Sequence, residues 1–367
     1  MLPRSPLLLA LTCALFLSAG AHAQDYTSEP IRIPMPGAGA NGLEGLVVRE
    51  RAFDRRPLVV ISHGSPREAK ARRTMAPGAF LPQAIEFARR GFAVLVLMRR
   101  GYGDSGGNFA EGIGPCADPD YPKAVAASAA DIRAAIAHMA RRPDIDGARV
   151  LSVGQSAGGF ASVALASDPP TGLVAGINFA GGRGSRTDGV VCQDARLVEA
   201  FRTLGRRART PMLWVYAEND SFFGPALAQR FREAYTSGGA RVDFVAALPY
   251  ARDGHSLFPS PGGIPIWTPI VDRFLTGQKL VLRERLPPPP PRPTIAPPAQ
   301  LSEAGKRDFE NYLISGPHKA FAISASGSYG WRSGQRSAET ARAGALQFCG
   351  QRAKDCRLIA VDDSAVK

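Results

Sequence analysis

Histidine and cysteine are scarce in this chain, with five of each among 367 residues. No Cys-x-x-Cys pair and no cluster of histidines with cysteines occurs, so the sequence indicates neither a zinc site nor any other cofactor. Long apolar runs are also missing. The run at Leu7–Leu17 is too short to span a membrane, and no later stretch is long enough, so no transmembrane segment is expected.

The first 23 residues have the features of a secretory signal peptide. Arg4 supplies the positive start, Leu7–Leu17 the apolar core, and Ala21-His22-Ala23 a small-residue cleavage site. The mature chain is predicted to begin near Gln24 and to be periplasmic or secreted in a bacterium. An uncleaved N-terminal anchor is the alternative. No cysteine follows the cleavage site, so a lipoprotein anchor is not expected.

Acidic residues are outnumbered, because 45 Lys and Arg against 32 Asp and Glu give a formal net charge of +13. The basic residues lie in scattered pairs such as Arg99-Arg100 and Arg206-Arg207, and not in one tract. No nucleic-acid-binding motif accompanies them, and export argues against a nucleic-acid partner. The simpler interpretation is a solvated basic surface. The alternative is attraction to an anionic polymer of the cell envelope.

Cleavage of the leader would remove Cys13 and leave an even number of cysteines. An even number in an exported chain favours disulfide bonds. Cys349 and Cys356 are close together at the end of a predicted helix and are the first pair expected. Cys116 and Cys192 would then pair by elimination and tie two loops together.

The stretch Val150–Phe160 combines an apolar run, Gly-Gln-Ser-Ala-Gly and the start of a helical pattern that ends at Asp168-Pro169. A strand, Gly-x-Ser-x-Gly and a helix form the nucleophile-elbow pattern. The turn is so tight that Gly154 and Gly158 must be very small. The pattern predicts Ser156 as a nucleophile held over the free N–H groups of a helix N-terminus.

A second Gly-x-Ser-x-Gly occurs at Gly103–Gly107 and resembles the serine loop of chymotrypsin-like proteases. Four residues separate it from the strand expected at 92–98, and no helix follows it directly. We therefore interpret Ser105 as part of a surface turn and not as a second nucleophile.

Between the leader and residue 280, apolar strand patterns alternate with amphipathic helix patterns. Strands are expected at 31–35, 43–49, 58–62, 92–98, 150–153, 173–179, 212–217 and 242–248. Helices are expected at 82–90, 122–142, from 160 to the stop at 168, and at 195–205, 225–236 and 264–275, with an irregular polar stretch at 181–194. Such alternation predicts an α/β, doubly wound and mostly parallel sheet, with the two leading strands as an antiparallel edge.

Composition divides the rest of the chain. An α/β domain over 24–280 is followed by a proline-rich linker over 281–300, which is expected to be extended. Residues 301–367 form a small predicted α+β module, with strands at 320–325 and 357–361 and a helix from Ser337. So small a module lacks a deep core, and a disulfide between its two cysteines would stabilise it.

Ser156 needs a base within hydrogen-bond reach, and the base needs a carboxylate to orient it. On an elbow-bearing sheet the acid and then the histidine follow the serine along the chain. His255, in the loop after strand 242–248, is the predicted base. The other histidines precede the serine or lie beyond the linker: His22, His63, His138 and His318. We assign His63 to the architecture of its loop.

The predicted acid is Asp220, in Glu218-Asn219-Asp220 after strand 212–217. Glu218 still lies at the strand end and is the weaker candidate, and Asp188 and Asp194 are more distant alternatives. Otherwise, Glu218 or Asp220 would cap the helix near Pro225 or form a loop salt bridge.

Two backbone N–H groups are predicted to bind the oxyanion of the tetrahedral intermediate. The first belongs to Ala157, directly after the nucleophile. The second belongs to Ser65, because Gly64 allows close approach of the backbone and Pro66 has no N–H to offer.

Several segments together resemble the α/β-hydrolase superfamily over residues 31–275. They are Ser62–Ser65, Arg100–Gly106, Gly154–Gly158, Glu218–Asp220 and Gly254-His255. The helix before the elbow and the turn at Asp144–Asp146 are most similar to the dienelactone-hydrolase and prolyl-oligopeptidase-like branch. Dienelactone hydrolases use a cysteine nucleophile, so serine favours a general esterase. The tail resembles an uncharacterised module of exported bacterial proteins, which implies no chemistry.

These residues predict an exported serine hydrolase that cleaves a small-molecule carboxylic ester through an acyl-enzyme. A peptidase or amidase with the same triad is the second hypothesis. A non-catalytic binding protein of the cell envelope on a hydrolase scaffold is the third. The sequence does not indicate the acyl or alcohol group. We expect the segment 181–205, pinned by Cys192, to shape the pocket.

Overall fold

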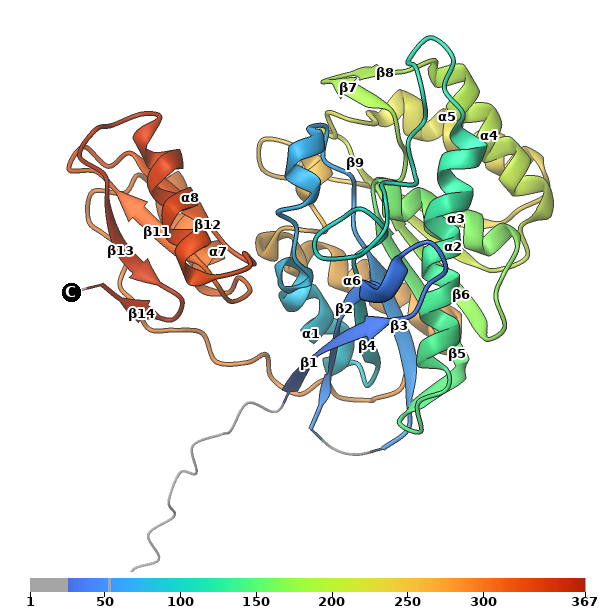
Figure 1. The fold of residues 1–367 in the computed structure, drawn as a ribbon, viewed down its shortest axis with the longest axis horizontal. Coiled ribbons are helices and arrows are strands. Elements are labelled where there is room, and N and C mark those ends of the chain that lie inside the picture. Colours follow the sequence, from blue (N-terminus) through green and yellow to red (C-terminus); the bar gives the residue numbers. More distant parts are fainter. Residues whose placement is uncertain (1–25, 52–53, 367) are drawn as a thin grey trace, which may run out of the picture.

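The computed structural model describes residues 26–51 and 54–366 (Figure 1). A large sheet with helices on both faces forms the body, and a small second sheet with two helices lies at its side. The predicted signal peptide lies outside the described residues. Within the described ranges, no helix has the length and apolar character needed to cross a bilayer.

The large sheet has eight strands in the order β1-β2-β4-β3-β5-β6-β9-β10. Their bounds are β1 Tyr26–Ile33, β2 Leu43–Glu50, β3 Arg56–Ser62, β4 Ala93–Leu97, β5 Ile145–Gln155, β6 Leu173–Phe179, β9 Met212–Ala217 and β10 Val242–Ala247. Strand β2 pairs antiparallel with β1 and with β4, and every other pairing is parallel. The prediction of a doubly wound, mostly parallel sheet with an antiparallel leading edge is confirmed.

Helices cover both faces of this sheet. They are α1 Leu81–Arg89, α2 Tyr121–Met139, α3 Ala157–Ser167, α4 Asp194–Arg207, α5 Pro225–Ser237 and α6 Ile264–Gly277. Short 3₁₀ turns are η1 Gly39–Asn41, η2 Ala69–Arg72, η3 Pro77–Phe80, η4 Gly254–Ser256 and η5 Pro261–Gly263. Alternate side chains of β3 enter different cores: Leu58 and Val60 pack with α2–α5, and Val59 and Ile61 pack with α1 and α6. Both faces of the central strands are therefore apolar.

Two local expectations are only partly right. The segment 181–194 is not irregular throughout, because it contains the hairpin β7 Ser185–Thr187 and β8 Val190–Val191. Of the predicted turn at Asp144–Asp146, Asp144 lies in a turn, whereas Ile145 and Asp146 already belong to β5 and pair with β3. Both segments are polar, so no strand pattern is visible there in the sequence. Their backbone pairing depends on the neighbouring strands.

The serine of the second Gly-x-Ser-x-Gly copy is buried, although Asp104 beside it is exposed. Ser105 is 1% exposed. Its hydroxyl donates to Met98 O at 2.7 Å and accepts from Glu44 N–H at 2.8 Å. A Cβ at Gly106 would lie 1.9 Å from Ala38 O. The glycine is thus required by packing against a neighbouring loop, and the serine satisfies buried backbone groups.

Residues 301–366, which we call the C-terminal module, form a four-stranded antiparallel sheet in the order β12-β11-β13-β14 with two helices. Their bounds are α7 Glu303–Leu313, β11 Ala320–Ile323, β12 Tyr329–Arg332, α8 Ala338–Gly350, β13 Arg357–Val361 and β14 Ser364–Ala365. The sequence missed α7, β12 and β14. Residues 281–300 form no helix or strand.

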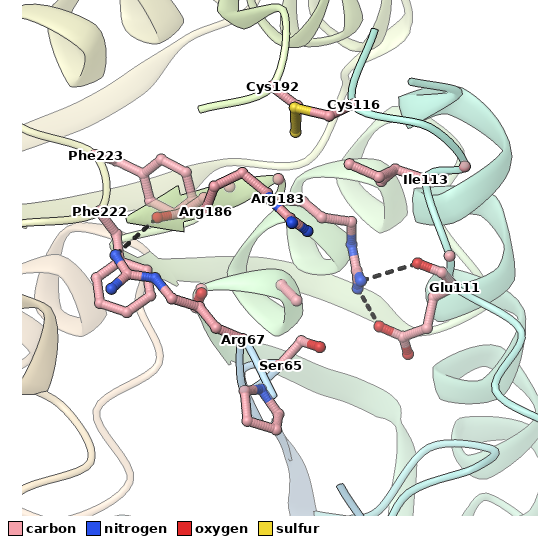
Figure 2. Close-up of a pocket in the computed structure, with 18 of the residues that line it drawn as sticks. Ser65, Arg67, Glu111, Ile113, Cys116, Arg183, Arg186, Cys192, Phe222 and Phe223 are labelled. Atoms are coloured by element: carbon pink, nitrogen blue, oxygen red, sulfur yellow. Dashed lines mark hydrogen bonds and ion pairs between the residues drawn. A yellow bond between two sulfur atoms is a disulfide. The ribbon is translucent and has the colours of Figure 1, made fainter. Parts of the chain in front are cut away.

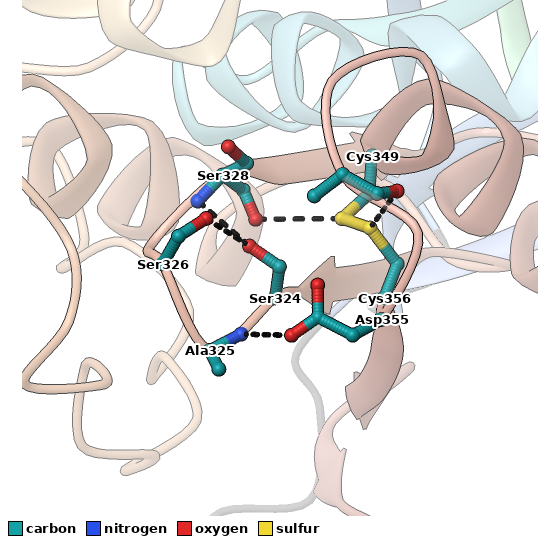
Figure 3. The surroundings of a disulfide bond; sticks show 8 residues. Ser324, Ala325, Ser326, Ser328, Cys349, Asp355 and Cys356 are labelled. Carbon is teal, nitrogen blue, oxygen red and sulfur yellow. Dashed lines mark hydrogen bonds between the residues drawn. A yellow bond between two sulfur atoms is a disulfide. The ribbon is translucent and has the colours of Figure 1, made fainter.

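The structure joins Cys349 to Cys356 and Cys116 to Cys192 by disulfide bonds. The first ties the end of α8 to the segment that leads into β13 (Figure 3). Beside it, Asp355 accepts a hydrogen bond from Ala325 N–H at 2.9 Å. The module is therefore held by covalent and polar contacts as well as by its small cores.

Candidate active site

Ser156 occupies the sharp turn between the end of β5 and the start of α3. Its φ is +55°, a backbone conformation that non-glycine residues rarely adopt and that is concentrated at functional sites. A Cβ at Gly154 would lie 2.0 Å from Gly158 O, and one at Gly158 would lie 2.1 Å from Ser62 O. Both flanking positions must therefore be glycine, for the steric reason that the sequence indicated.

Asp220 and His255 come from two later loops and meet at hydrogen-bond distance. His255 Nδ1 lies 3.0 Å from Asp220 Oδ2 and 3.2 Å from Oδ1. The other side of the carboxylate is held by backbone N–H groups, because Asp220 Oδ1 accepts from Phe222 at 2.7 Å and from Phe223 at 2.9 Å. With Nδ1 facing the acid, Nε2 is the nitrogen left to exchange a proton with a substrate.

The His255 ring is held in place from further directions. Its backbone N–H donates to Asp253 Oδ1 at 2.9 Å, which caps the short turn η4. The Phe222 ring stacks on the imidazole with centroids 3.9 Å apart. Asp220 and His255 are both buried, with exposed fractions of 5% and 8%. Such fixed and largely dry geometry is what a preorganised base requires.

Ser156 and His255 line the same cavity, and Gln155 Nε2 donates to His255 O at 3.3 Å, which links the elbow to the histidine loop. In the described part of the chain no hydrogen bond joins the Ser156 hydroxyl to the His255 ring. Contacts of this kind often tighten only when substrate is bound.

The alternative acids lie elsewhere. Asp188 pairs with Arg67, and Asp194 pairs with Arg230. Glu218, the residue after β9, is exposed. Of the four carboxylates considered from the sequence, Asp220 is the one that the structure brings to His255.

The two predicted oxyanion donors flank Ser156. Ala157 is the first residue of α3, where backbone N–H groups have no partner within the helix. On the other side, a Cβ at Gly64 would lie 3.1 Å from Ser156 Cβ, so the loop after β3 passes directly beside Ser156. Ser65 and Ala157 line one cavity together with Ser156.

A buried ionic cluster lies under the loop after β3. It is not predicted from the sequence, because the paired arginines are expected to be solvated. Arg99 is 0% exposed and Glu111 is 1% exposed. Arg99 Nε donates to Glu111 Oε1 at 2.5 Å, and Arg183 pairs with the other oxygen. Burial alone would raise the pKa of the Glu111 carboxyl, but attraction to Arg99 and Arg183 holds that pKa well below its usual range.

This cluster fixes the loop after β3. Arg99 Nη1 donates to His63 O at 2.7 Å, and its backbone N–H donates to His63 Nε2 at 3.2 Å. His63 Nδ1 then donates to Gly64 O at 2.6 Å. Burial first, and Arg99 second, lower the pKa of His63 to about 3, so the ring is neutral. His63 is thus part of the loop's architecture. A signal that could have found the cluster is the position of Arg99 directly after a buried strand.

Two cavities open beside Ser156, with volumes of about 300 Å³ and 480 Å³. We call them the first and the second cavity. Their walls share Ser65, Pro66, Arg67, Ser156 and Phe222. Ala157 lines only the first cavity, and His255 lines only the second. Ala157 and His255 therefore line different cavities beside Ser156, whereas Ser65, the other predicted oxyanion donor, lines both.

The first cavity is strongly basic (Figure 2). Its lining arginines are Arg67, Arg72, Arg183 and Arg186. The Arg67 guanidinium lies 3.8 Å from the centre of the Phe222 ring. Arg72 and Arg186 form no ion pair within residues 26–51 and 54–366, which leaves their charge for solvent or ligand. The Cys116–Cys192 disulfide closes one end, and residues from the 181–205 segment form a wall, as expected.

The order of the eight strands, the elbow after the central strand β5 and the helices on both faces define the α/β-hydrolase fold. The chain therefore has this fold over its large sheet. A family model described as X-Pro dipeptidyl-peptidase (S15 family) matches residues 54–208, which is less than half of the chain. No curated protein gave a match to the sequence.

Several solved hydrolases are similar at low identity. An esterase of Thermogutta terrifontis is 18% identical with a TM-score of 0.48, covering 69% of this chain and 94% of its own. A Klebsiella pneumoniae protein classed as a dienelactone hydrolase is 15% identical with a TM-score of 0.47, covering 69% and 98%. The Pyrococcus horikoshii acylaminoacyl peptidase is 16% identical with a TM-score of 0.47, covering 72% of this chain but 43% of its own.

Proposed function

We propose that this protein is an exported serine hydrolase that cleaves a carboxylic ester. The observation that carries the proposal is the Asp220–His255 pair at 3.0 Å, whose histidine lines the same cavity as Ser156 on its elbow. The two disulfides are in keeping with export to an oxidising compartment.

In the proposed reaction, the Ser156 hydroxyl attacks the ester carbonyl while His255 Nε2 accepts its proton. Asp220 holds the imidazole in the correct tautomer, and the N–H groups of Ala157 and Ser65 bind the oxyanion. Collapse of the intermediate breaks the C–O bond, and His255 returns the proton to the departing alcohol. Water, activated by the same base, then hydrolyses the acyl-enzyme and releases the acid.

The test is labelling of the mature chain by a fluorophosphonate probe together with turnover of p-nitrophenyl esters. Ser156→Ala should abolish both while the melting temperature stays close to that of wild type. The matched control is Ser105→Ala, in the other Gly-x-Ser-x-Gly copy, which should keep both if it remains folded. Undiminished labelling of Ser156→Ala would refute the assignment of the nucleophile.

A peptidase or amidase with the same residues is the second candidate, and the match to the X-Pro dipeptidyl-peptidase model favours it. Turnover of an X-Pro-anilide with higher kcat/KM than a matched ester would establish this reaction instead. Binding of cell-envelope polymer with no turnover of either substrate would indicate the non-catalytic role.

A further inference from the structure

One arginine, Arg336, anchors the C-terminal module to the α/β body close to the second cavity. Arg336 Nη1 lies 3.0 Å from Glu44 Oε1 and 2.7 Å from Asp104 Oδ2, and its Nη2 lies 2.8 Å from Glu44 Oε2. Nη2 also donates to Met75 O at 2.5 Å. Hydrogen bonds between a guanidinium and two carboxylates are directional and strong. They therefore fix the orientation of the module.

Backbone also packs directly on backbone across this contact. Gly334 has a φ of +59°, and a Cβ there would lie 2.2 Å from Ala79 Cα. A Cβ at Gly316 would lie 2.3 Å from Gly78 O. Any larger residue at these two glycines would push the module away. The close approach brings the loop after β12 to the edge of the second cavity.

The second cavity lies between the α/β body and the module. Gln155, Ser156 and His255 form one part of its wall, and Arg332, Gly334 and Gln335 of the module form another. Much of the remaining wall is apolar, with Met75, Ala76, Ala79 and Phe80. Its volume of about 480 Å³ is within the range of small-molecule sites.

The direction of proton transfer decides which part of a substrate enters this cavity. In acyl transfer the histidine that took the serine proton gives it to the leaving group, so the leaving group must lie on the histidine side. His255 lines the second cavity and Ala157 lines the first. The departing alcohol therefore belongs in the second cavity, and the acyl group belongs in the first.

We propose that the C-terminal module forms a wall of the leaving-group subsite, and that this subsite takes an apolar alkyl or aryl alcohol. This inference rests on the proposed function. Gln335 and Arg332 are then specificity-determining residues. Arg332 adds a second cationic group, in addition to Arg67 on the shared wall, to a chamber whose remaining wall is largely apolar. Its guanidinium lies 4.1 Å from the centre of the Phe348 ring. The tail that resembled a module without chemistry thus contributes directly to substrate choice.

The test compares methyl acetate with 1-naphthyl acetate, which share an acyl group and differ in the alcohol. Gln335→Trp, in the full mature chain, should fill the chamber and lower the ratio of kcat/KM for naphthyl over methyl ester about tenfold, mainly through KM. Gln351→Trp makes the same change at an exposed position of the module outside the cavity lining and should leave the ratio unchanged. Arg336→Ala, which releases the anchor, should lower the ratio as well.

A second measurement does not depend on turnover. Binding of 1-naphthol to the wild type should be detectable by calorimetry and should weaken about tenfold in Gln335→Trp. If the wild type hydrolyses no ester but shows this pattern of naphthol binding, the proposed function fails and the subsite stands. If esters are hydrolysed and Gln335→Trp leaves both the ratio and naphthol binding unchanged, or lowers both esters equally, the subsite is refuted.

Discussion

The neutral, buried His63 makes the stability of this protein fall in mild acid. An unfolded histidine gains a proton below its ordinary pKa of about 6.5, whereas His63 in the fold resists protonation down to about 3. Between these values the unfolded state binds more protons than the native state, so the free energy of unfolding decreases as pH falls. At pH 5 the loss from this single ring is about 2 kcal/mol relative to pH 8.

The assay is urea unfolding at pH 8 and at pH 5, followed by tryptophan fluorescence. This window lies above the ordinary pKa values of carboxylates, so the Glu111 cluster adds little to the change. His63→Gln cannot titrate, and the difference between the two pH values should shrink by about 2 kcal/mol even if the variant is less stable at both. His138→Gln is the matched control. The His138 ring is partly exposed, and burial, followed by Arg141, lowers its pKa. Because this ring is less buried than His63, His138→Gln should alter the difference in stability between the two pH values less than His63→Gln.

Proton NMR gives the direct test. The His63 ring should show no titration above about pH 4, and its Nδ1 proton should persist because it is bonded to Gly64 O. An imidazole that titrates near 6.5 in the folded protein would refute the reasoning, since the proton would have to occupy Nε2 and break its contact with Arg99 N–H.

Three further outcomes follow from the same structure. Asp220→Asn should lower kcat about 10⁴-fold with little change in melting temperature, because the amide selects the wrong tautomer of His255; a loss below tenfold in steady-state ester turnover would argue against the assignment. Replacing Cys116 and Cys192 together by alanine should lower the free energy of unfolding, measured by urea titration, by about 2–5 kcal/mol. The same change should lower kcat/KM for esters of bulky acyl groups more than for acetyl esters, because the disulfide lines the first cavity. An equal loss for all acyl groups would contradict a role of the disulfide in the wall of that cavity. Glu111→Gln should lower the free energy of unfolding, measured by urea titration, by about 3–5 kcal/mol, because the buried guanidiniums of Arg99 and Arg183 lose their shared carboxylate. A loss below about 1 kcal/mol would mean that water solvates the two guanidiniums in its place.

The sequence by itself determined the features that depend on local sterics. Gly154 and Gly158 are required by contacts within the elbow and with the adjacent loop, so the nucleophile turn was readable from a few neighbouring residues. Apolar runs buried on both faces indicated the parallel strands, and the proline-rich stretch indicated a segment without helix or strand. The order of serine, acid and histidine along the chain then pointed to Asp220 and His255, which the fold brings together.

Only the tertiary structure decided which distant side chains meet. Arg99, Glu111 and Arg183 form one buried cluster because loops after different strands converge at the same edge of the sheet, and no local pattern records that convergence. The anchoring of Arg336 to Glu44 spans 292 positions of the chain. Charges far apart in sequence acquire partners only when the strand order and the path of the linker are fixed. The composition of the wall of the second cavity therefore became visible only in three dimensions.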